Sequence, residues 1–389
     1  MTKKLSKWLG LSFAVALCLL AIVQYRSIAE ANVQEYWLKA EEIYWDYTPS
    51  YPVNEMTGEN LDEDQLVFTE NTDDRIGRIY RKAVFRSYTP EYQEIIDGPN
   101  EVIDPKTGKM KIIRQPGSRE EHLGMLGPIV RAEVGQKVIV HLKNETSFPV
   151  SFHVHGFLYT KANEGAPYND GTSAVDKGDD NIGPGQSYTY NFEVPERAGP
   201  GPSDYNSVVW PYHSHADETR DTNSGLMGAI IVYEKNSLDR NTGLPKGVDR
   251  EFVSLFKVID ENISLYIDKN IAEFAPNADT EDGDFEESNL MHGINGLLYG
   301  NLTGLNIKQN EEVRWYLMGM GTEVDIHTPH WEGETLLEGT HRLDTAQIFP
   351  ATVKTLEMIA DRPGTWQYSC HVNDHISAGM KTTYTIDPS

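Results

Sequence analysis

Apolar and polar residues alternate in short runs along most of this chain, and Gly, Pro, Asn or Asp closes each run. The stretches VGQKVIVHLKN (134–144) and SYTYNFEVPE (187–196) show this in the first half, and EEVRWYLMGMG (311–321) and KTTYTID (381–387) in the second. Successive side chains of a strand point to opposite faces, so a two-residue period predicts strands with one buried face. Past the first residues, no segment has the pattern of a long amphipathic helix. We therefore predict an all-β fold built from β-sandwiches.

The two halves of the chain repeat one another. Each half has a strand-like segment, then a short histidine motif, and near its end an aromatic segment that leads into another histidine. In chain order these segments are GQKVIVHL, SFHVHG and WPYHSH, and then NEEVRWYL, DIHTPHWEG and WQYSCH. The stretch between them, EKNSLDRNTGLPKGVD, is polar and rich in turn residues. We predict two Greek-key β-sandwich domains, residues 32–233 and 250–389, with a linker at 234–249.

The first residues have the pattern of an export signal. A lysine-rich start precedes an apolar run over residues 8–23, and a small-x-small sequence follows at 29–31. We predict a signal peptide at 1–31 and an exported protein, located in the periplasm, outside the cell or on the outer face of a membrane. The alternative is an uncleaved N-terminal membrane anchor. Cleavage would remove Cys18 and leave Cys370 as the only cysteine, so no internal disulfide would form.

Charge narrows the range of partners. The formal net charge is −25 at pH 7. Such a chain repels nucleic acid and anionic lipid, whereas it attracts cations and basic partners. Nucleic-acid binding is therefore excluded from the functions considered.

The segment SCHVNDHISAGM (369–380) carries the first chemical signal. It places Cys370, His375 and Met380 at four-residue gaps, and His327 lies on a neighbouring predicted strand. Two imidazoles, one thiolate and a weak thioether select copper and favour electron transfer, whereas zinc usually takes four strong ligands. We predict a type 1 (blue) copper site at these four residues.

Histidine pairs give the second signal. His153 and His155, and likewise His213 and His215, are two residues apart, so each pair lies on one face of a strand. The second half adds His330 and His371, and together these six histidines predict a metal cluster between the two sequence copies. The other four histidines have no such partners and are predicted to be structural: His122, His141, His292 and His341.

Cys370 and His371 are adjacent in the sequence. If Cys370 holds one copper and His371 another, a short covalent route joins the two metals. An electron accepted at the first site would then pass directly to the cluster.

These motifs resemble the multicopper oxidase family, and within it the ceruloplasmin and hephaestin group. SFHVHG, WPYHSHADETRDTNSGLMGAIIV, DIHTPHWEG and SCHVNDHISAGM carry the resemblance, which extends over nearly the whole mature chain. It implies two cupredoxin-like domains, similar to the first and last domains of that group joined together, as in two-domain laccases. It also implies a homotrimer, with each cluster between domain 1 of one subunit and domain 2 of the next. Dioxygen would be the electron acceptor, and Fe(II) or a small molecule the donor.

The resemblance also assigns cluster ligands. In the family, eight histidines hold three copper ions. By that pattern His153 and His330 would hold the type 2 copper, while His155, His213 and His371 would hold one type 3 copper.

The second type 3 position departs from the family. Its ligands would be His215 and two positions that are occupied here by Glu332 and Ser369. Glu332 would be an oxygen ligand, and carboxylates favour harder metals than imidazole does. Both losses fall on one ion, which indicates a cluster of one to three ions, rebuilt with one copper fewer or with a different metal. Two alternatives follow: a copper reductase of the nitrite-reductase type, or a non-catalytic copper or electron-transfer protein.

Acidic positions suggest two further sites. Glu261 and Asp374 match acidic positions at the iron site of ceruloplasmin-like ferroxidases, and the alternative is that both are solvated surface acids. Asp176, Asp179 and Asp180, with the Lys161 carbonyl, resemble the calcium site of the group's first domain, since several oxygens on one loop suit Ca²⁺. A plain acidic turn is the alternative there.

Overall fold

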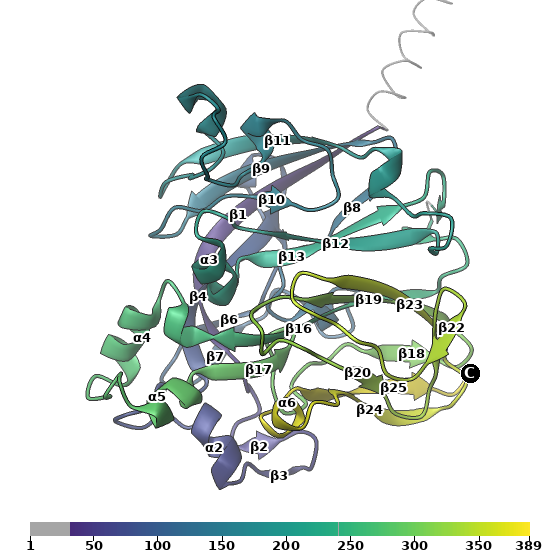
Figure 1. Ribbon diagram of the computed structural model, residues 1–389. Coiled ribbons are helices and arrows are strands. Elements are labelled where there is room, and N and C mark those ends of the chain that lie inside the picture. Colours follow the sequence, from purple (N-terminus) through teal and green to yellow (C-terminus); the bar gives the residue numbers. More distant parts are fainter. Residues whose placement is uncertain (1–31, 240) are drawn as a thin grey trace, which may run out of the picture.

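The computed structural model describes residues 32–239 and 241–389 (Figure 1). The predicted signal peptide or membrane anchor at 1–31 lies outside the described residues. Within those ranges no helix is both long and apolar enough to cross a membrane.

The first half of the chain forms two sheets. One is ordered β11-β9-β1-β4-β5, with β6 beside β1 and β7 beside β6, and the other is ordered β10-β12-β13-β8. The strands of the larger sheet are β1 (Val33–Asp46), β4 (Ile79–Tyr88), β5 (Ile95–Asp97), β6 (Glu101–Asp104), β7 (Lys109–Lys111), β9 (Lys137–Glu145) and β11 (Ser187–Glu193). Those of the smaller are β8 (Val130–Glu133), β10 (His153–Val154), β12 (Ser207–His213) and β13 (Met227–Tyr233).

The second half also forms two sheets, ordered β17-β16-β19-β23-β21-β22 and β18-β25-β24-β20. The first contains β16 (Arg250–Asp260), β17 (Leu290–Ile294), β19 (Glu312–Gly319), β21 (Leu336–Glu338), β22 (His341–Leu343) and β23 (Val353–Ile359). The second contains β18 (Asn306–Lys308), β20 (Pro329–Trp331), β24 (Gly364–Cys370) and β25 (Lys381–Asp387). The all-β prediction is confirmed, and each half is a sandwich of two sheets.

The remaining elements are short. Two-stranded ribbons form from β2 (Val53–Asn54) with β3 (Glu59–Asn60), and from β14 (Leu238–Asp239) with β15 (Leu244–Pro245). The α-helices are α2 (Glu63–Thr69), α3 (Glu218–Ser224), α4 (Ile267–Phe274), α5 (Gly283–Ser288) and α6 (Asn373–Ser377). Single 3₁₀ turns occupy Pro90–Tyr92, Glu121–Leu123, Lys161–Asn163, Ala174–Lys177, Glu196–Ala198 and Glu261–Ile263.

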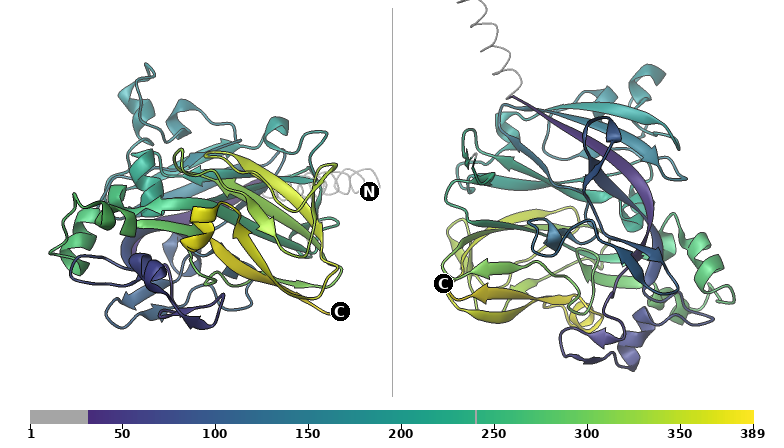
Figure 2. Two further views of the ribbon diagram at one scale, coloured as in Figure 1. Left: turned by 60° about the horizontal axis from the view of Figure 1, so that its bottom comes forward. Right: turned by 180° about the vertical axis from the view of Figure 1, so that it is seen from behind.

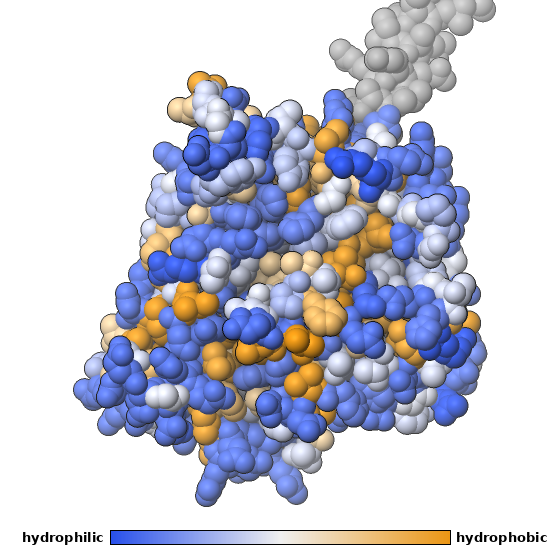
Figure 3. Space-filling view, in the orientation of Figure 1, coloured by the Kyte–Doolittle hydropathy of each residue, from blue (hydrophilic) through white to orange (hydrophobic). Residues whose placement is uncertain are grey.

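Alternation along the strands produces the cores. In β9, Val138, Val140 and Leu142 are buried, while the residues between them are partly exposed. One apolar core runs across both halves, because residues of β12 and β13 such as Val209 and Ile231 belong to the same cluster as Trp315 on β19. Both views of Figure 2 show the two sandwiches packed against each other. The face seen in Figure 3 is largely hydrophilic, in keeping with the charge of the chain.

Candidate metal centres

The predicted copper loop is assembled from three places in the second sandwich. Cys370 is the last residue of β24, and its backbone N–H donates to the carbonyl of Met380, 3.0 Å away. His375 lies on α6, between them. His327 precedes β20 and is fixed by a reciprocal backbone pair with Ile348. We call these four ligand candidates, His327, Cys370, His375 and Met380, the thiolate site.

Three donors of the thiolate site converge. The Cys370 Sγ lies 3.6 Å from Nδ1 of His375 and 3.9 Å from Nδ1 of His327, and the two Nδ1 atoms are 3.0 Å apart. All four side chains are buried, with Met380 fully so. Two imidazole nitrogens and one sulfur at these separations fit an ion bound at about 2.0–2.3 Å to each. Three of the four predicted ligands thus lie close together, and the blue copper site at these residues stays a prediction.

Electrostatics prepare the thiolate site for a cation. Burial alone would raise the pKa of Cys370, but the imidazoles of His327 and His375 lower it to about 6. The thiolate, which is the form that binds metal, therefore dominates at neutral pH. A backbone N–H, from Thr328, also points at the sulfur, at 3.4 Å.

Asp325 fixes one imidazole from behind. Its Oδ1 lies 3.2 Å from Nε2 of His327, and the same carboxylate accepts backbone N–H groups from Val258 and Thr322. Burial opposes charge on both groups, yet their contact lowers the pKa of Asp325 and raises that of His327. Such a partner sets the tautomer and ring orientation, leaving Nδ1 free for a metal.

The histidine pairs of the first sandwich also converge. His153 on β10 pairs across the sheet with His213 on β12, and the Nε2 atoms of His155 and His213 are 3.3 Å apart. Donor atoms of these three residues all lie within 4.8 Å of one another. His215 adjoins them, with its ring centroid 5.1 Å from that of His153. We call these four histidines the first-half cluster.

Hydrogen bonds to backbone carbonyls orient two imidazole rings of the first-half cluster. Nδ1 of His153 and Nδ1 of His213 each contact a backbone carbonyl, at 2.6 and 3.0 Å, which leaves Nε2 for a metal. Burial lowers the pKa of His153, and it lowers those of His155 and His213 to about 4. These rings are neutral at pH 7, as metal ligands must be.

His330, Glu332 and His371 form the second-half cluster, with donor atoms within 4.8 Å of one another. Strands β20 and β24 bring them together, and the rings of His330 and His371 are 4.7 Å apart. Nδ1 of His330 contacts Oγ1 of Thr345 at 2.9 Å. Ser369 is fully buried and accepts a hydrogen bond from Gln367.

The first-half and second-half clusters are separate in one chain. Each close group of metal-binding donors in the described ranges draws its members from one half only. A cluster that combines all six histidines therefore needs a second copy, as the resemblance implies, and this remains a prediction.

The prediction of an iron site at Glu261 needs correction. Glu261 is completely buried, forms an ion pair with Lys82 and accepts a hydrogen bond from Tyr47 at 2.5 Å. A carboxylate whose charge is matched by a buried lysine is not available to a surface cation. Asp374 is exposed and remains a candidate.

The predicted calcium loop finds no support in the close groups of metal-binding donors, and calcium there stays a prediction. Asp176, Asp179 and Asp180 do not form one of the groups of carboxylate or imidazole donors within 4.8 Å. Asp180 instead faces Lys177 at 3.7 Å, and Asp179 accepts the backbone N–H of Gly165. The Lys161 side chain pairs with Glu164 and Asp170. This geometry gives calcium no support.

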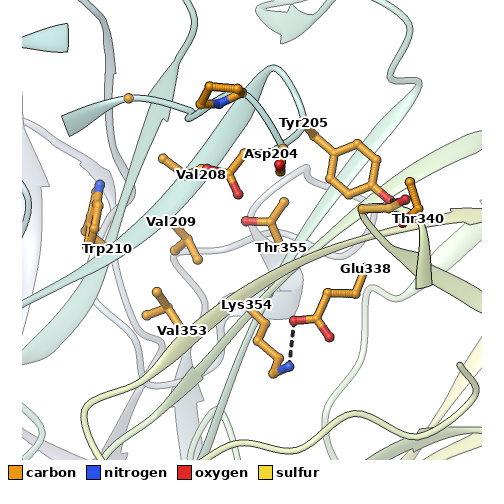
Figure 4. Close-up of a pocket in the computed structure, with 14 residues that line it drawn as sticks. Asp204, Tyr205, Val208, Val209, Trp210, Glu338, Thr340, Val353, Lys354 and Thr355 are labelled. Carbon is orange, nitrogen blue, oxygen red and sulfur yellow. Dashed lines mark hydrogen bonds and ion pairs between the residues drawn. The ribbon is translucent and has the colours of Figure 1, made fainter. Parts of the chain in front are cut away.

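One surface cavity lies away from the close groups of metal-binding donors. It measures about 710 Å³ and lies between β12 and β23. In Figure 4, Val208, Val209 and Trp210 line one side and Val353, Lys354 and Thr355 the other, with the Lys354–Glu338 ion pair at its rim. A second cavity, about 450 Å³, opens onto His153 and His155.

Of the other four histidines, His341 is exposed and the rest have structural contacts. For example, His122 accepts the backbone N–H of Val253 with Nε2. His292 lies nearest to a metal site, with its ring 5.4 Å from that of His375, but its Nδ1 contacts the Leu290 carbonyl.

Sequence reasoning missed two carboxylates beside predicted ligands. Asp325 is two residues before His327, and Glu218 is three residues after His215, with its Oε2 3.1 Å from the His215 Nε2. A search for acids near each histidine would have found both. That contact raises the pKa of His215 and lowers that of Glu218 to about 2.

The comparisons with known proteins agree with this chemistry. Two multicopper oxidase family models match, at residues 123–237 and 270–389. Ferroxidase HEPHL1 of Homo sapiens is 41% identical over 95% of this chain and 30% of its own length. Ceruloplasmin of Homo sapiens is 38% identical over 92% of this chain and 32% of its own. The chain thus spans about a third of the length of these relatives.

Solved structures share the fold. A multicopper oxidase superposes with a TM-score of 0.55 at 18% identity, over 91% of this chain and 89% of that one. A copper nitrite reductase from Nitrosomonas europaea gives the same TM-score and identity, over 91% and 94%.

Proposed function

Because the chain belongs to the multicopper oxidase family, we propose that it is an exported copper oxidoreductase of the ferroxidase or laccase kind. It oxidises Fe(II) or a small reductant and reduces dioxygen. The observation that carries the proposal is at the end of β24, where Cys370 of the thiolate site is followed at once by His371 of the second-half cluster. Copper, when bound, supplies one-electron transfer at both places.

The residues around the thiolate site suit electron entry without substrate binding. Cys370 and His327 have no exposed surface, so a donor delivers its electron from outside. The exposed Asp374 directly precedes His375, and its carboxylate would attract a cation such as Fe(II) to that point. The acidic surface as a whole favours the same donor.

Electron transfer then needs no conformational change. The backbone N–H of His371 donates to the Thr328 carbonyl at 2.9 Å, and that of Cys370 to Met380, so the peptide unit joining the two sites is fixed on both sides. The overall reaction takes four electrons and four protons to convert one dioxygen into two waters, with four Fe(II) becoming four Fe(III).

The clusters meet between subunits in this proposal. The four histidines of the first-half cluster and the two histidines of the second-half cluster are complementary halves of one site, and a homotrimer brings them together around its axis. Both halves lie at strand ends of rigid sandwiches, which suits a site that is shared across an interface.

A second candidate is a copper reductase acting on nitrite or a similar small oxyanion. The observation that favours it is the loss of imidazole at Glu332 and Ser369, because a cluster with fewer coppers suits one- or two-electron chemistry. A non-catalytic electron carrier is the third reading of the same losses.

Oxygen consumption separates these functions. We expect the copper-loaded protein to consume dioxygen when Fe(II) or a small-molecule donor is added, at one dioxygen per four electrons. Absence of consumption, with anaerobic turnover of nitrite by a reduced donor, would favour the reductase. A blue protein that turns over neither acceptor would be an electron carrier.

A further inference from the structure

Glu218 lies beside two histidines of the first-half cluster, His213 and His215. Its Oε2 is 3.1 Å from Nε2 of His215, and its Oε1 is 3.9 Å from Nε2 of His213. Half of its side chain remains exposed, on the same surface as the first-half cluster. In the family pattern three histidines hold the second type 3 copper, and His215 is the one of these three that this chain keeps.

The separation of the two donor atoms fits one metal ion. With bonds of about 2.1 Å to nitrogen and oxygen, a 3.1 Å separation corresponds to an angle of about 95° at the metal. Adjacent positions of an octahedral ion have nearly this angle. The two groups contact each other directly in the structure, and an ion between them would replace that contact.

Glu332 is the carboxylate of the second-half cluster, and it stands at one of the two positions where the family pattern has a further histidine ligand of the ion held by His215. Its Oε1 is 3.3 Å from Nε2 of His330, and its side chain is 49% exposed. Each half of the proposed site therefore carries one carboxylate beside an imidazole.

Helix stabilisation does not account for Glu218. It is the first residue of α3, where an acid is favourable, but Asp217 already caps this helix by accepting the Arg220 N–H. Its carboxylate is turned toward His213 and His215 instead.

We propose that Glu218 and His215 of one copy, with Glu332 of the next, form a mixed nitrogen–oxygen site for an ion such as Mn(II) or Fe(II). One imidazole and two carboxylates suit a harder ion than Cu(I). The site takes the place of the second type 3 copper. The inference rests on the proposed function in one respect: both need the first-half cluster of one copy to meet the second-half cluster of the next.

Manganese binding to the copper-loaded protein tests this inference. We expect about one Mn(II) per chain, read by metal analysis and by loss of the sharp six-line EPR signal of free Mn(II), beyond the copper that gives the blue band. Glu218→Gln and Glu332→Gln should each weaken Mn(II) binding by about 10- to 100-fold and leave the blue absorption unchanged.

Glu63→Gln is the matched control, because Glu63 is also the first residue of a helix, α2, that is capped by the preceding aspartate. It should bind Mn(II) as the unaltered chain does. Unchanged Mn(II) binding by Glu218→Gln, or no binding by an assembled oligomer, would overturn the inference. The mass in solution and the oxygen assay together separate the two proposals. A protein that is monomeric and binds no Mn(II) would overturn both. A protein that binds Mn(II) but consumes no oxygen would overturn only the oxidase.

Discussion

We expect the Cys370→Ser variant to lack the blue absorption and to oxidise the donor only at background rate. Serine has nearly the same volume but no soft thiolate, so the donor set at His327 and His375 no longer selects copper with blue-site character. The buried sulfur lies 3.6 and 3.9 Å from the two imidazoles, and no other thiol exists in the described ranges. Visible absorption and oxygen uptake, both measured on one preparation of the variant, test this prediction.

Copper content distinguishes loss of the site from loss of the fold. Cys370→Ser should lose about one copper per chain and keep the ions held by the histidine clusters, which use other residues. Thr382→Ser, a buried hydroxyl on β25 that donates to the Leu302 carbonyl, is the control for disturbance of the core, and should stay blue. A blue Cys370→Ser variant would refute the assignment of electron entry to this residue.

Removing the charge of Lys82 destabilises the protein by about 3–5 kcal/mol. Lys82 has no exposed surface, and its Nζ donates to Glu261 and to the Asn223 carbonyl. Lys82→Met keeps the volume but leaves the Glu261 carboxylate buried without a counter-charge. The free energy of unfolding in urea measures the loss.

The double variant Lys82→Met/Glu261→Gln identifies charge as the cause. It should recover much of the stability, because it removes both buried charges together. Lys111→Met, whose ion pair with Glu101 is on the surface, should change stability by less than about 1 kcal/mol. If Lys82→Met fell in that range too, the pair would not contribute to stability as described.

The fold was largely predictable because its signals are local. The alternating stretch VGQKVIVHLKN contains β9, in which Val138 and Val140 are buried, and EEVRWYLMGMG contains β19. The convergence of donors at the thiolate site has a local signal too, since three of its four ligand candidates lie within eleven residues.

Contacts between segments far apart in the sequence were harder to predict. The pairing of Glu261 with Lys82 joins residues 179 positions apart, and only packing of the first sandwich on the second reveals it. The family resemblance suggested that Glu261 is an iron ligand, but its carboxylate is buried and pairs with Lys82 instead. The calcium loop stays a prediction without support, because Lys177, one of the loop's own residues, pairs with Asp180.

Mixing two inactive variants tests the shared cluster most directly. His155→Ala removes a ligand from the first-half cluster and His371→Ala one from the second, and neither variant alone should consume dioxygen. In trimers assembled from equal amounts of both, about one site in four combines two intact halves, so about a quarter of the unaltered activity should return. A mixture that stays inactive although mixed trimers have formed would contradict a cluster built between copies of this chain.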